Sequence, residues 1–429
     1  MSSVPMDIFI NEKGGLIVDF LKEALRTMRF ANVVNIHTTH AMSRQELANY
    51  LDDVCIVAGD ESIHKTHHEL DMRTGRTIHI YLAVHMYGIV SLKYSVKENT
   101  FTDLAFHIES PSDNDDYVVA STLSEKVVDL KDVVLYTKIE RIKKVLKDQW
   151  HVSKQLELLG LINNEAHRLL KECRLVLALM DGSILPWRIN LEIAPKSKIF
   201  AGLPDEITNK ILDEETRLFS GFNKLFSDVQ NSDGLVLVGA VKSSKDKSLH
   251  AALNIITSDE VSDQVRLADI MGEGTILRSF AREHRFELFK EKLGRLGIEY
   301  GGYNMDFYYI RKDVTMYPLK VEILPSATLS SNVVSAVPHL LMHMVVESSK
   351  HTIVARRTGS GFLKIPTLRP IDIIDRKISM EGESEIVRSV YLLEKVWEKV
   401  RDVIVECAYT RGRCSLSKKH IESLAGGET

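Results

Sequence analysis

Two aspartates, Asp60 and Asp181, each follow a short run of apolar residues. Asp60 ends the run in "VCIVAGDES", and Asp181 ends the run in "RLVLALMDGS". Runs of this kind are typical of strands buried on both faces, so each carboxylate is expected at a strand end. If the strands are neighbours, the carboxylates converge and repel, and a hard cation such as Mg²⁺ or Mn²⁺ with oxygen ligands relieves the repulsion. The alternative is that each aspartate only caps a turn or a helix.

A third carboxylate, Glu165, precedes the strand that ends at Asp181. Glu165 belongs to a series of residues spaced three or four apart, whose other members are the apolar Leu158, Leu161 and Leu169 and Cys173. It therefore lies within the apolar face of a predicted helix. A buried glutamate is costly unless it is paired, hydrogen-bonded or bound to a metal. We therefore expect Glu165 near the two aspartates. The alternative is that its carboxylate lies at the edge of the apolar stripe, in water.

The elements that must position these residues follow from hydrophobic periodicity. Strands are predicted at 54–59, at 77–97 as two strands that bend near Gly88, at 174–180, at 234–242, and as a pair in "MDFYYIRK" and "LKVEILP". Helices are predicted at 15–50, at 138–172, in "NVVSAVPHLLMHMVVESS" and at 382–406, the last as a core-packing element or a dimer or partner surface. Strands mixed with long helices in this order predict the α/β class.

Composition narrows the class of protein. With 429 residues, 44% of them hydrophobic, the chain can bury a large core. Its formal charge of −4 gives no global basic field for nucleic acid, so any basic surface is local or belongs to a partner. We expect no membrane segment, because no apolar run approaches about 20 residues, and a cytoplasmic location. Four scattered cysteines without a CxxC pair fit a reducing compartment, with Cys55 and Cys173 as core residues.

The order of the short motifs resembles that of the NurA nucleases. An apolar strand ending in "GDES" is followed by a helix with "NNEAHRLL", then by "LVLALMDGSILP", "LVLVGAVKSSKD", "YPLKVEILP" and "AVPHLLMH". Each motif is short, but their order and the gap between Glu165 and Asp181 are more specific. The resemblance covers roughly residues 50–350.

The resemblance implies an RNase H-like mixed sheet flanked by helices. On this basis we divide the chain into an N-terminal helical segment (1–49), a nuclease domain (50–350) and a C-terminal helical segment (367–429) that packs on the core or on a partner. It also implies a manganese-dependent 5′ to 3′ exonuclease on DNA that also cleaves single strands internally. It further implies that the protein is a homodimer and has a hexameric HerA-type DNA translocase as its partner. The two would act together in DNA end processing or in defence against foreign DNA.

The same resemblance assigns site residues. Asp60, Glu165 and Asp181 correspond to metal-binding and catalytic carboxylates, and His343 to a histidine that holds metal or acts on the scissile phosphate. Lys242 falls at a strand-terminal lysine that contacts a phosphate. Lys320 stands where an arginine is more usual, which keeps the charge but loses the bidentate fork.

Two departures from the family pattern concern the first and last motifs. Glu61 occupies a position at which the family more often has glycine, so it is either a further ligand or a distortion of the turn. Ser335 replaces a common tyrosine, which leaves no tyrosine role there. His339 and His343 lie four apart, but no glutamate follows the first histidine as in an HExxH zinc site.

Other functions stay open at the level of sequence. The chain could be a catalytically inactive assembly subunit of the translocase complex, or an RNA-directed RNase H-like enzyme, which would need contacts to 2′-hydroxyl groups. The histidine-rich "HKTHHEL" is predicted to be a solvated loop. "TGSGFLK" has neither the spacing nor the strand-to-helix context of a phosphate-binding loop, which argues against an ATPase.

Overall fold

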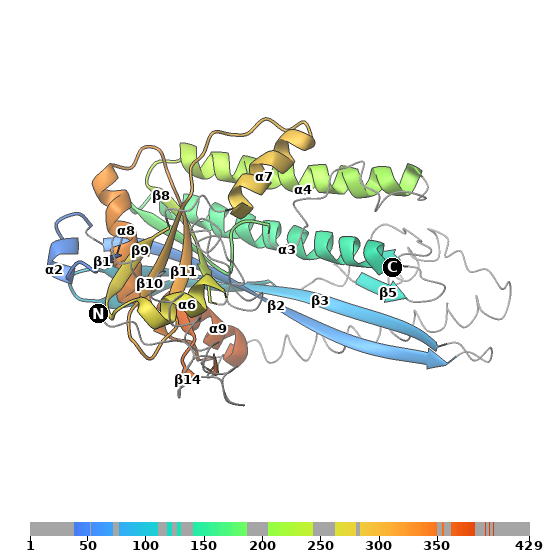
Figure 1. Cartoon of the computed structure of the whole chain (residues 1–429), viewed down its shortest axis with the longest axis horizontal. Coiled ribbons are helices and arrows are strands. Elements are labelled where there is room, and N and C mark those ends of the chain that lie inside the picture. Colours follow the sequence, from blue (N-terminus) through green and yellow to red (C-terminus); the bar gives the residue numbers. More distant parts are fainter. Residues whose placement is uncertain are drawn as a thin grey trace, which may run out of the picture.

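The structure is a computed structural model, and it centres on one large mixed sheet (Figure 1). It describes residues 38–51, 53–71, 77–109, 118–121, 127–129, 140–186, 205–242, 262–279, 284–349, 354–355 and 362–381, together with 391, 394 and 398. The sheet has the strand order β1-β9-β10-β11-β8-β7-β2-β3-β5-β6, and β4 also pairs with β3.

The centre of this sheet has the RNase H-like arrangement that was predicted. β2 (Asp53–Asp71), β3 (Thr77–Ser95) and β4 (Thr100–Glu109) form an antiparallel meander. β7 (Val176–Asp181) pairs in parallel with β2, and β8 (Leu235–Val241) pairs in parallel with β7. The long helices α3 (Glu140–Leu169) and α4 (Asp205–Asn231) make these two crossovers. The α/β prediction is therefore confirmed.

Antiparallel strands extend the sheet on both sides of this centre. On one side lie β11 (Leu319–Pro325), β10 (Asp306–Arg311), β9 (Thr275–Arg278) and β1 (Thr38–His40). On the other side β5 (Val118–Ser121) and β6 (Val127–Asp129) follow β3. The predicted pairing of "MDFYYIRK" with "LKVEILP" is confirmed as β10 with β11.

β2 and β3 form a hairpin far longer than the sequence suggested. β2 pairs with β7 only from Cys55 to Gly59, and beyond that point it continues to Asp71 paired with β3. The hairpin therefore projects from the sheet, as the two long blue arrows in Figure 1 show. Three predictions were wrong here. The strand does not end at Asp60, which lies within β2. The segment "HKTHHEL" belongs to β2 rather than to a loop, and β3 does not bend at Gly88.

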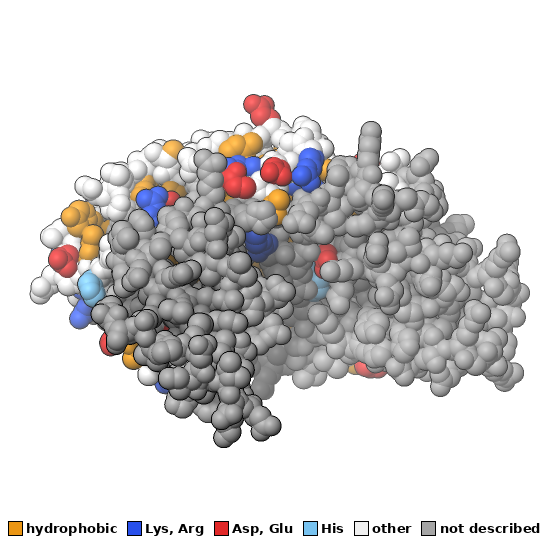
Figure 2. Space-filling view, viewed as in Figure 1, with side chains coloured by type: hydrophobic (Ala, Val, Ile, Leu, Met, Phe, Trp, Pro, Cys, Tyr) orange, Lys and Arg blue, Asp and Glu red, His pale blue; other side chains and the backbone are white. Residues whose placement is uncertain are grey.

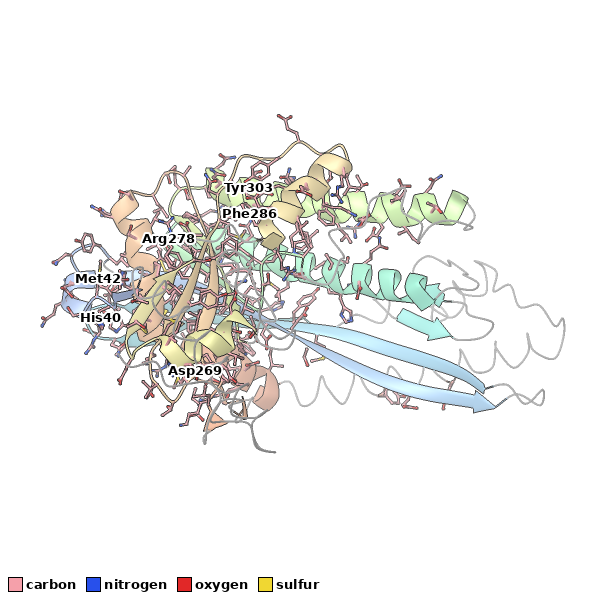
Figure 3. The ribbon with its side chains drawn as sticks, in the orientation of Figure 1. His40, Met42, Asp269, Arg278, Phe286 and Tyr303 are labelled. Carbon is pink, nitrogen blue, oxygen red and sulfur yellow. A yellow bond between two sulfur atoms is a disulfide. The ribbon has the colours of Figure 1, made fainter. Side chains whose placement is uncertain are left out.

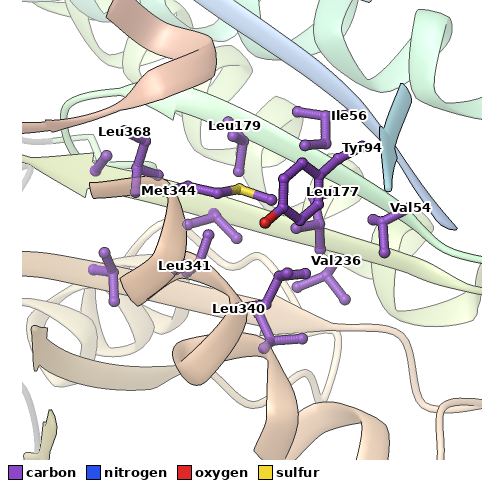
Figure 4. Close-up of a cluster of buried hydrophobic side chains, with 14 of the residues drawn as sticks. Val54, Ile56, Tyr94, Leu177, Leu179, Val236, Leu340, Leu341, Met344 and Leu368 are labelled. Carbon is purple, nitrogen blue, oxygen red and sulfur yellow. The ribbon is translucent and has the colours of Figure 1, made fainter. Parts of the chain in front are cut away.

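Helices cover both faces of the sheet. α3, α4 and α7 (His284–Arg295) pack on one face, above the strands in Figure 1. α8 (Ser331–Met344) and α9 (Arg369–Glu381) pack on the other, with the short helix α2 (Arg44–Leu47) beside α8. Figure 4 shows the apolar cluster under α8, to which Leu340 and Leu341 of the helix and Ile56, Leu177 and Val236 of the sheet belong. The core thus forms two layers separated by the sheet.

The remaining elements connect these layers. α6 (Asp263–Ile270) follows β8, and two small sheets join β12 (Val345–Glu347) to β15 (Pro366–Leu368) and β13 (Val354–Ala355) to β14 (Phe362–Leu363). The predicted helix at 15–50 lies partly outside the described residues, and its end forms β1 and α2 instead. Almost all of the predicted helix at 382–406 also lies outside them.

Cys55 is buried in the core layer under α3, and Cys173 packs against that layer, as predicted. They form a disulfide that links the start of β2 to the turn after α3. This pair does not fit the reducing compartment that the scattered cysteines favoured. Among the described residues, no helix is long and apolar enough to cross a membrane.

Candidate metal centre

Three carboxylates meet at one edge of the sheet. Asp60 of β2, Asp181 of β7 and Asp375 of α9 each offer one oxygen, and these oxygens lie within 4.8 Å of one another. Asp60 and Asp375 are buried, and Asp181 is partly exposed. Opposite oxygens around one Mg²⁺ are about 4.2 Å apart, so small side-chain adjustments suffice for one ion to contact all three residues.

The alternation of strand side chains puts the two strand aspartates on the same face. Ile56 and Ala58 precede Asp60 at two-residue steps, and Leu177 and Leu179 precede Asp181 in the same way. All four apolar residues belong to the core layer under α8 and α9. Because β2 and β7 are paired up to Gly59 and Met180, the next residue of each strand brings its carboxylate to the same place.

α9 supplies the third carboxylate because it packs closely on β2 and β3. Ile371, Ile374 and Ile378 form its buried stripe. Gly88 of β3 lies opposite Asp60, and a Cβ atom there would lie 2.8 Å from Cδ1 of Ile378. The absence of a side chain at Gly88 therefore lets α9 approach closely enough for Asp375 to reach the group.

Lys242, directly after β8, neutralises part of this charge. Its Nζ lies 2.7 Å from Oδ2 of Asp181 and 3.4 Å from Oδ2 of Asp375, and its side chain is 9% exposed. Burial acts to lower the pKa of Lys242, but Asp181, Asp375 and Asp60 raise it above its ordinary value. Three carboxylates and one ammonium leave a net formal charge of −2. Hard oxygen ligands with this charge fit one divalent cation.

The turn after Asp181 is held by buried polar contacts. Ser183 Oγ donates to Glu322 of β11 at 2.8 Å, and the backbone N–H of Ile184 donates to the same carboxylate at 2.9 Å. Gln155 of α3 donates to the carbonyls of Ser183 and Leu185. Gly182 has a φ of 101°, which only glycine adopts without strain. These contacts fix the strand end that carries Asp181.

Glu165 is not brought to this group. Its Oε1 accepts a hydrogen bond from Ser91 Oγ at 2.6 Å, and Arg168 donates to both of its oxygens. The contact with Arg168 lowers the pKa of Glu165. Burial acts to raise this pKa, and the hydrogen bond from Ser91 acts to lower it further. α3 covers the opposite face of the sheet from Asp60 and Asp181. The carboxylate therefore has its own partners there and helps line a cavity of about 600 Å³ between α3, β3 and β4.

His343 also lies elsewhere, against the N-terminal segment. Its Nε2 donates to the carbonyl of Met42 at 2.8 Å, and Nδ1 of His339 accepts from the N–H of the same residue at 3.0 Å. Figure 3 places Met42 beside His40 at the end of the molecule formed by β1 and α2. The two histidines, four residues apart on α8, thus clamp the backbone N–H and carbonyl of one residue, and this explains their spacing.

This clamp makes stability depend on pH. Burial and the neighbouring His343 lower the pKa of His339, although Glu46 acts to raise it. The unfolded chain takes up this proton below about pH 6.5, so stability is lost as pH falls from there toward the lower pKa of the folded protein. His339→Asn keeps an acceptor for the Met42 N–H but does not titrate. Urea unfolding at pH 7.5 and 5 should show a larger loss in the parent, and equal losses would contradict the clamp.

Lys320 is buried on the face opposite to Lys242. It lies in β11, with its Nζ 3.9 Å from Oε1 of Glu322 and 5.7 Å from the centre of the Phe307 ring. Alternation along β11 puts Leu319 and Val321 in the layer under α8 and α9, so Lys320 points away from Asp181. Its charge therefore balances Glu322, which holds the turn after Asp181.

Asp375 is the residue that the analysis of the sequence missed. It lies in "RPIDIIDRKI", a segment in which no candidate site residue was predicted. The signal was present, because Ile371, Ile374 and Ile378 recur at three- and four-residue steps and Asp375 lies beside that stripe. The rule that singled out Glu165 applies equally to Asp375.

Comparison with known proteins identifies one family. The model of the NurA domain matches residues 76–379, a range that contains Asp181, Lys242 and Asp375 but begins after Asp60. No curated protein matches the sequence.

Solved structures similar to this chain include the NurA nuclease from Sulfolobus solfataricus, at 11% identity over 88% of this chain and 93% of that one, with a TM-score of 0.40. Another is a NurA bound to dAMP and manganese, at 10% identity over 86% and 93%, with a TM-score of 0.41. A NurA with manganese matches at 10% identity over 77% and 89%, with a TM-score of 0.36.

Proposed function

Because this chain belongs to the NurA family, we propose that it is a nuclease that hydrolyses DNA with the help of a divalent cation at Asp60, Asp181 and Asp375. One observation carries the proposal. Three carboxylates from three different elements converge within 4.8 Å, with a buried lysine between two of them. Structural ion pairs seldom gather three buried or half-buried carboxylates around one ammonium, because the excess negative charge is costly.

Each residue of the candidate site has a separate role in the proposed reaction. Asp60, Asp181 and Asp375 would hold the cation, which when bound supplies Lewis-acid activation of water and neutralises charge on the phosphate. Asp181 is the most exposed of the three, so it faces the side from which DNA and water arrive. Glu322 and Gln155 act as positioning residues, because they fix the turn that follows Asp181.

The family resemblance extends the proposal to finer points. It favours manganese as the cation, 5′ to 3′ exonuclease activity with endonuclease activity on single strands, a homodimer, and a hexameric HerA-type translocase as partner in DNA end processing or in defence against foreign DNA. On the face shown in Figure 2, acidic and basic side chains of the described residues lie side by side. A translocase that grips the DNA backbone would complement such a surface.

Release of label from 5′-labelled linear DNA tests the proposal. The purified chain should cleave with Mn²⁺ and stop on addition of EDTA, and Asp181→Asn should not cleave although it folds normally. Matched RNA strands should be cleaved more slowly than DNA. If neither protein cleaves DNA with any divalent metal, even with the translocase present, the proposal fails and the inactive assembly subunit becomes the favoured alternative. Equal cleavage by parent and variant would place the activity at another site.

A further inference from the structure

The ammonium of Lys242 occupies the space between two of the three candidate ligands. It contacts Oδ2 of Asp181 at 2.7 Å and Oδ2 of Asp375 at 3.4 Å. These two residues are members of the group that also contains Asp60. Lys242 and a divalent cation therefore need the same carboxylates.

A divalent cation and an ammonium cannot share these carboxylates closely without strong repulsion. At a separation of about 4 Å, even two unit charges near a protein surface interact by several times thermal energy, and a double charge doubles the effect. The divalent ion binds carboxylate oxygens more strongly than an ammonium does, because it makes shorter contacts with twice the charge. Its arrival should therefore expel the ammonium from the group.

The backbone at Lys242 is fixed, whereas its side chain is long enough to move. Nε2 of Gln264 on α6 donates to the carbonyls of Val241 at 3.1 Å and Pro318 at 2.9 Å and lies 3.5 Å from that of Lys242. This buried amide anchors the end of β8. The four-carbon stem of lysine carries a compact charge on rotatable bonds, so the ammonium can leave Asp181 without disturbing the strand.

We propose, on the premise of the function proposed above, that Lys242 is the counter-ion of the metal-free site and that a divalent cation displaces its ammonium from Asp181 and Asp375. The freed ammonium then contacts a phosphate group of DNA. Metal binding and phosphate binding are thereby coupled through one side chain, because each stabilises the same displaced position of Lys242.

Mn²⁺ affinity is the first test, measured from the electron paramagnetic resonance signal of the free ion. Removing the competitor in Lys242→Met should tighten binding by about tenfold or more, whereas Lys242→Arg should not tighten it. Lys377→Met is the matched control. It removes a lysine of α9 that pairs with Asp103 outside the group, so its Mn²⁺ affinity should equal that of the parent. Lys242→Gln replaces the methionine variant if the latter does not fold.

DNA affinity is the second test, measured on phosphorothioate-linked oligonucleotides that resist hydrolysis. With Mn²⁺ present, the slope of log affinity against log salt concentration should be steeper by about one for the parent than for Lys242→Met. Without metal the two slopes should agree. Equal or weaker Mn²⁺ binding by Lys242→Met, or equal slopes with metal, would overturn the displacement of Lys242. Absence of Mn²⁺ binding by the parent itself would instead overturn the proposed metal site.

Discussion

Asp375→Asn is expected to reduce metal-dependent DNA cleavage by at least about a hundredfold, because even the outer partners of metal ligands contribute 10- to 100-fold and a direct ligand contributes more. Its melting temperature in the absence of metal should not fall. The substitution removes one negative charge from three mutually repelling carboxylates and leaves Lys242 paired with Asp181 at 2.7 Å. Single-turnover cleavage with saturating Mn²⁺, together with thermal unfolding, measures both effects.

Glu165→Gln is the matched control for this prediction. Glu165 has its partners Ser91 and Arg168 on the face of the sheet covered by α3, so the amide should retain most of the cleavage. The contrary pattern, in which Glu165→Gln abolishes cleavage and Asp375→Asn does not, would favour the ligand set implied by the family resemblance. In that case α3 would have to move relative to β2 in the active protein.

Strand periodicity is the part of the site that the sequence could predict. Residues 176–180 are apolar on both faces and end at Asp181, and the run before Asp60 behaves likewise. Two such strands belong in the centre of a sheet, where neighbouring carboxyl ends meet. The pattern predicts that Asp60 and Asp181 converge if the two strands are neighbours, and the pairing of β2 with β7 meets this condition.

Helical periodicity carries less information, because it identifies a buried stripe without identifying the surface that buries it. Leu158 and Leu169 of α3 are buried as expected, whereas Leu161 of the predicted stripe is only partly buried and Ile162 is buried instead. Their stripe faces the side of β2 that carries Val57 and Gly59, where a Cβ on Gly59 would lie 2.6 Å from Ile162. Glu165 meets Ser91, which pairs with Val57, and so lies three residues before Asp60 along β2 and on its other face.

The remaining differences between the prediction and the structure arise from contacts between segments that are distant in the sequence. His343 bonds to Met42, which lies 301 residues away in the sequence, and no local pattern indicates this partner. Gly88 was interpreted as a bend, since glycine in a strand often marks one. It instead provides the close approach of α9 that brings Asp375 to Asp60. Glycine at a strand position signals either role, and only the packing of the neighbouring helix distinguishes them.

Lys292→Met is expected to lower the free energy of unfolding by about 3–5 kcal/mol, the usual effect of removing one member of a buried ion pair. Lys292 of α7 is fully buried, and its Nζ lies 2.8 Å from Oε1 of Glu215 on α4. Burial raises the pKa of Glu215 even though Lys292 acts to lower it. Desolvation thus already outweighs the attraction of the lysine, and without Lys292 the carboxylate would be buried with this charge uncompensated.

The double variant Glu215→Leu/Lys292→Met should recover most of this loss, because apolar residues of similar volume often replace a buried ion pair without cost. Lys290→Met is the control on the same helix, since its ion pair with Glu287 is more exposed and should contribute no more than about 1 kcal/mol. The loss in Lys292→Met should also shrink as the pH falls, because the raised pKa of Glu215 lets its carboxylate take up a proton at a higher pH than an ordinary glutamate does. Urea unfolding of the four proteins at pH 7.5 and 5 measures these differences. Equal losses in the single and double variants would mean that Lys292 contributes through packing of its side chain rather than through its charge.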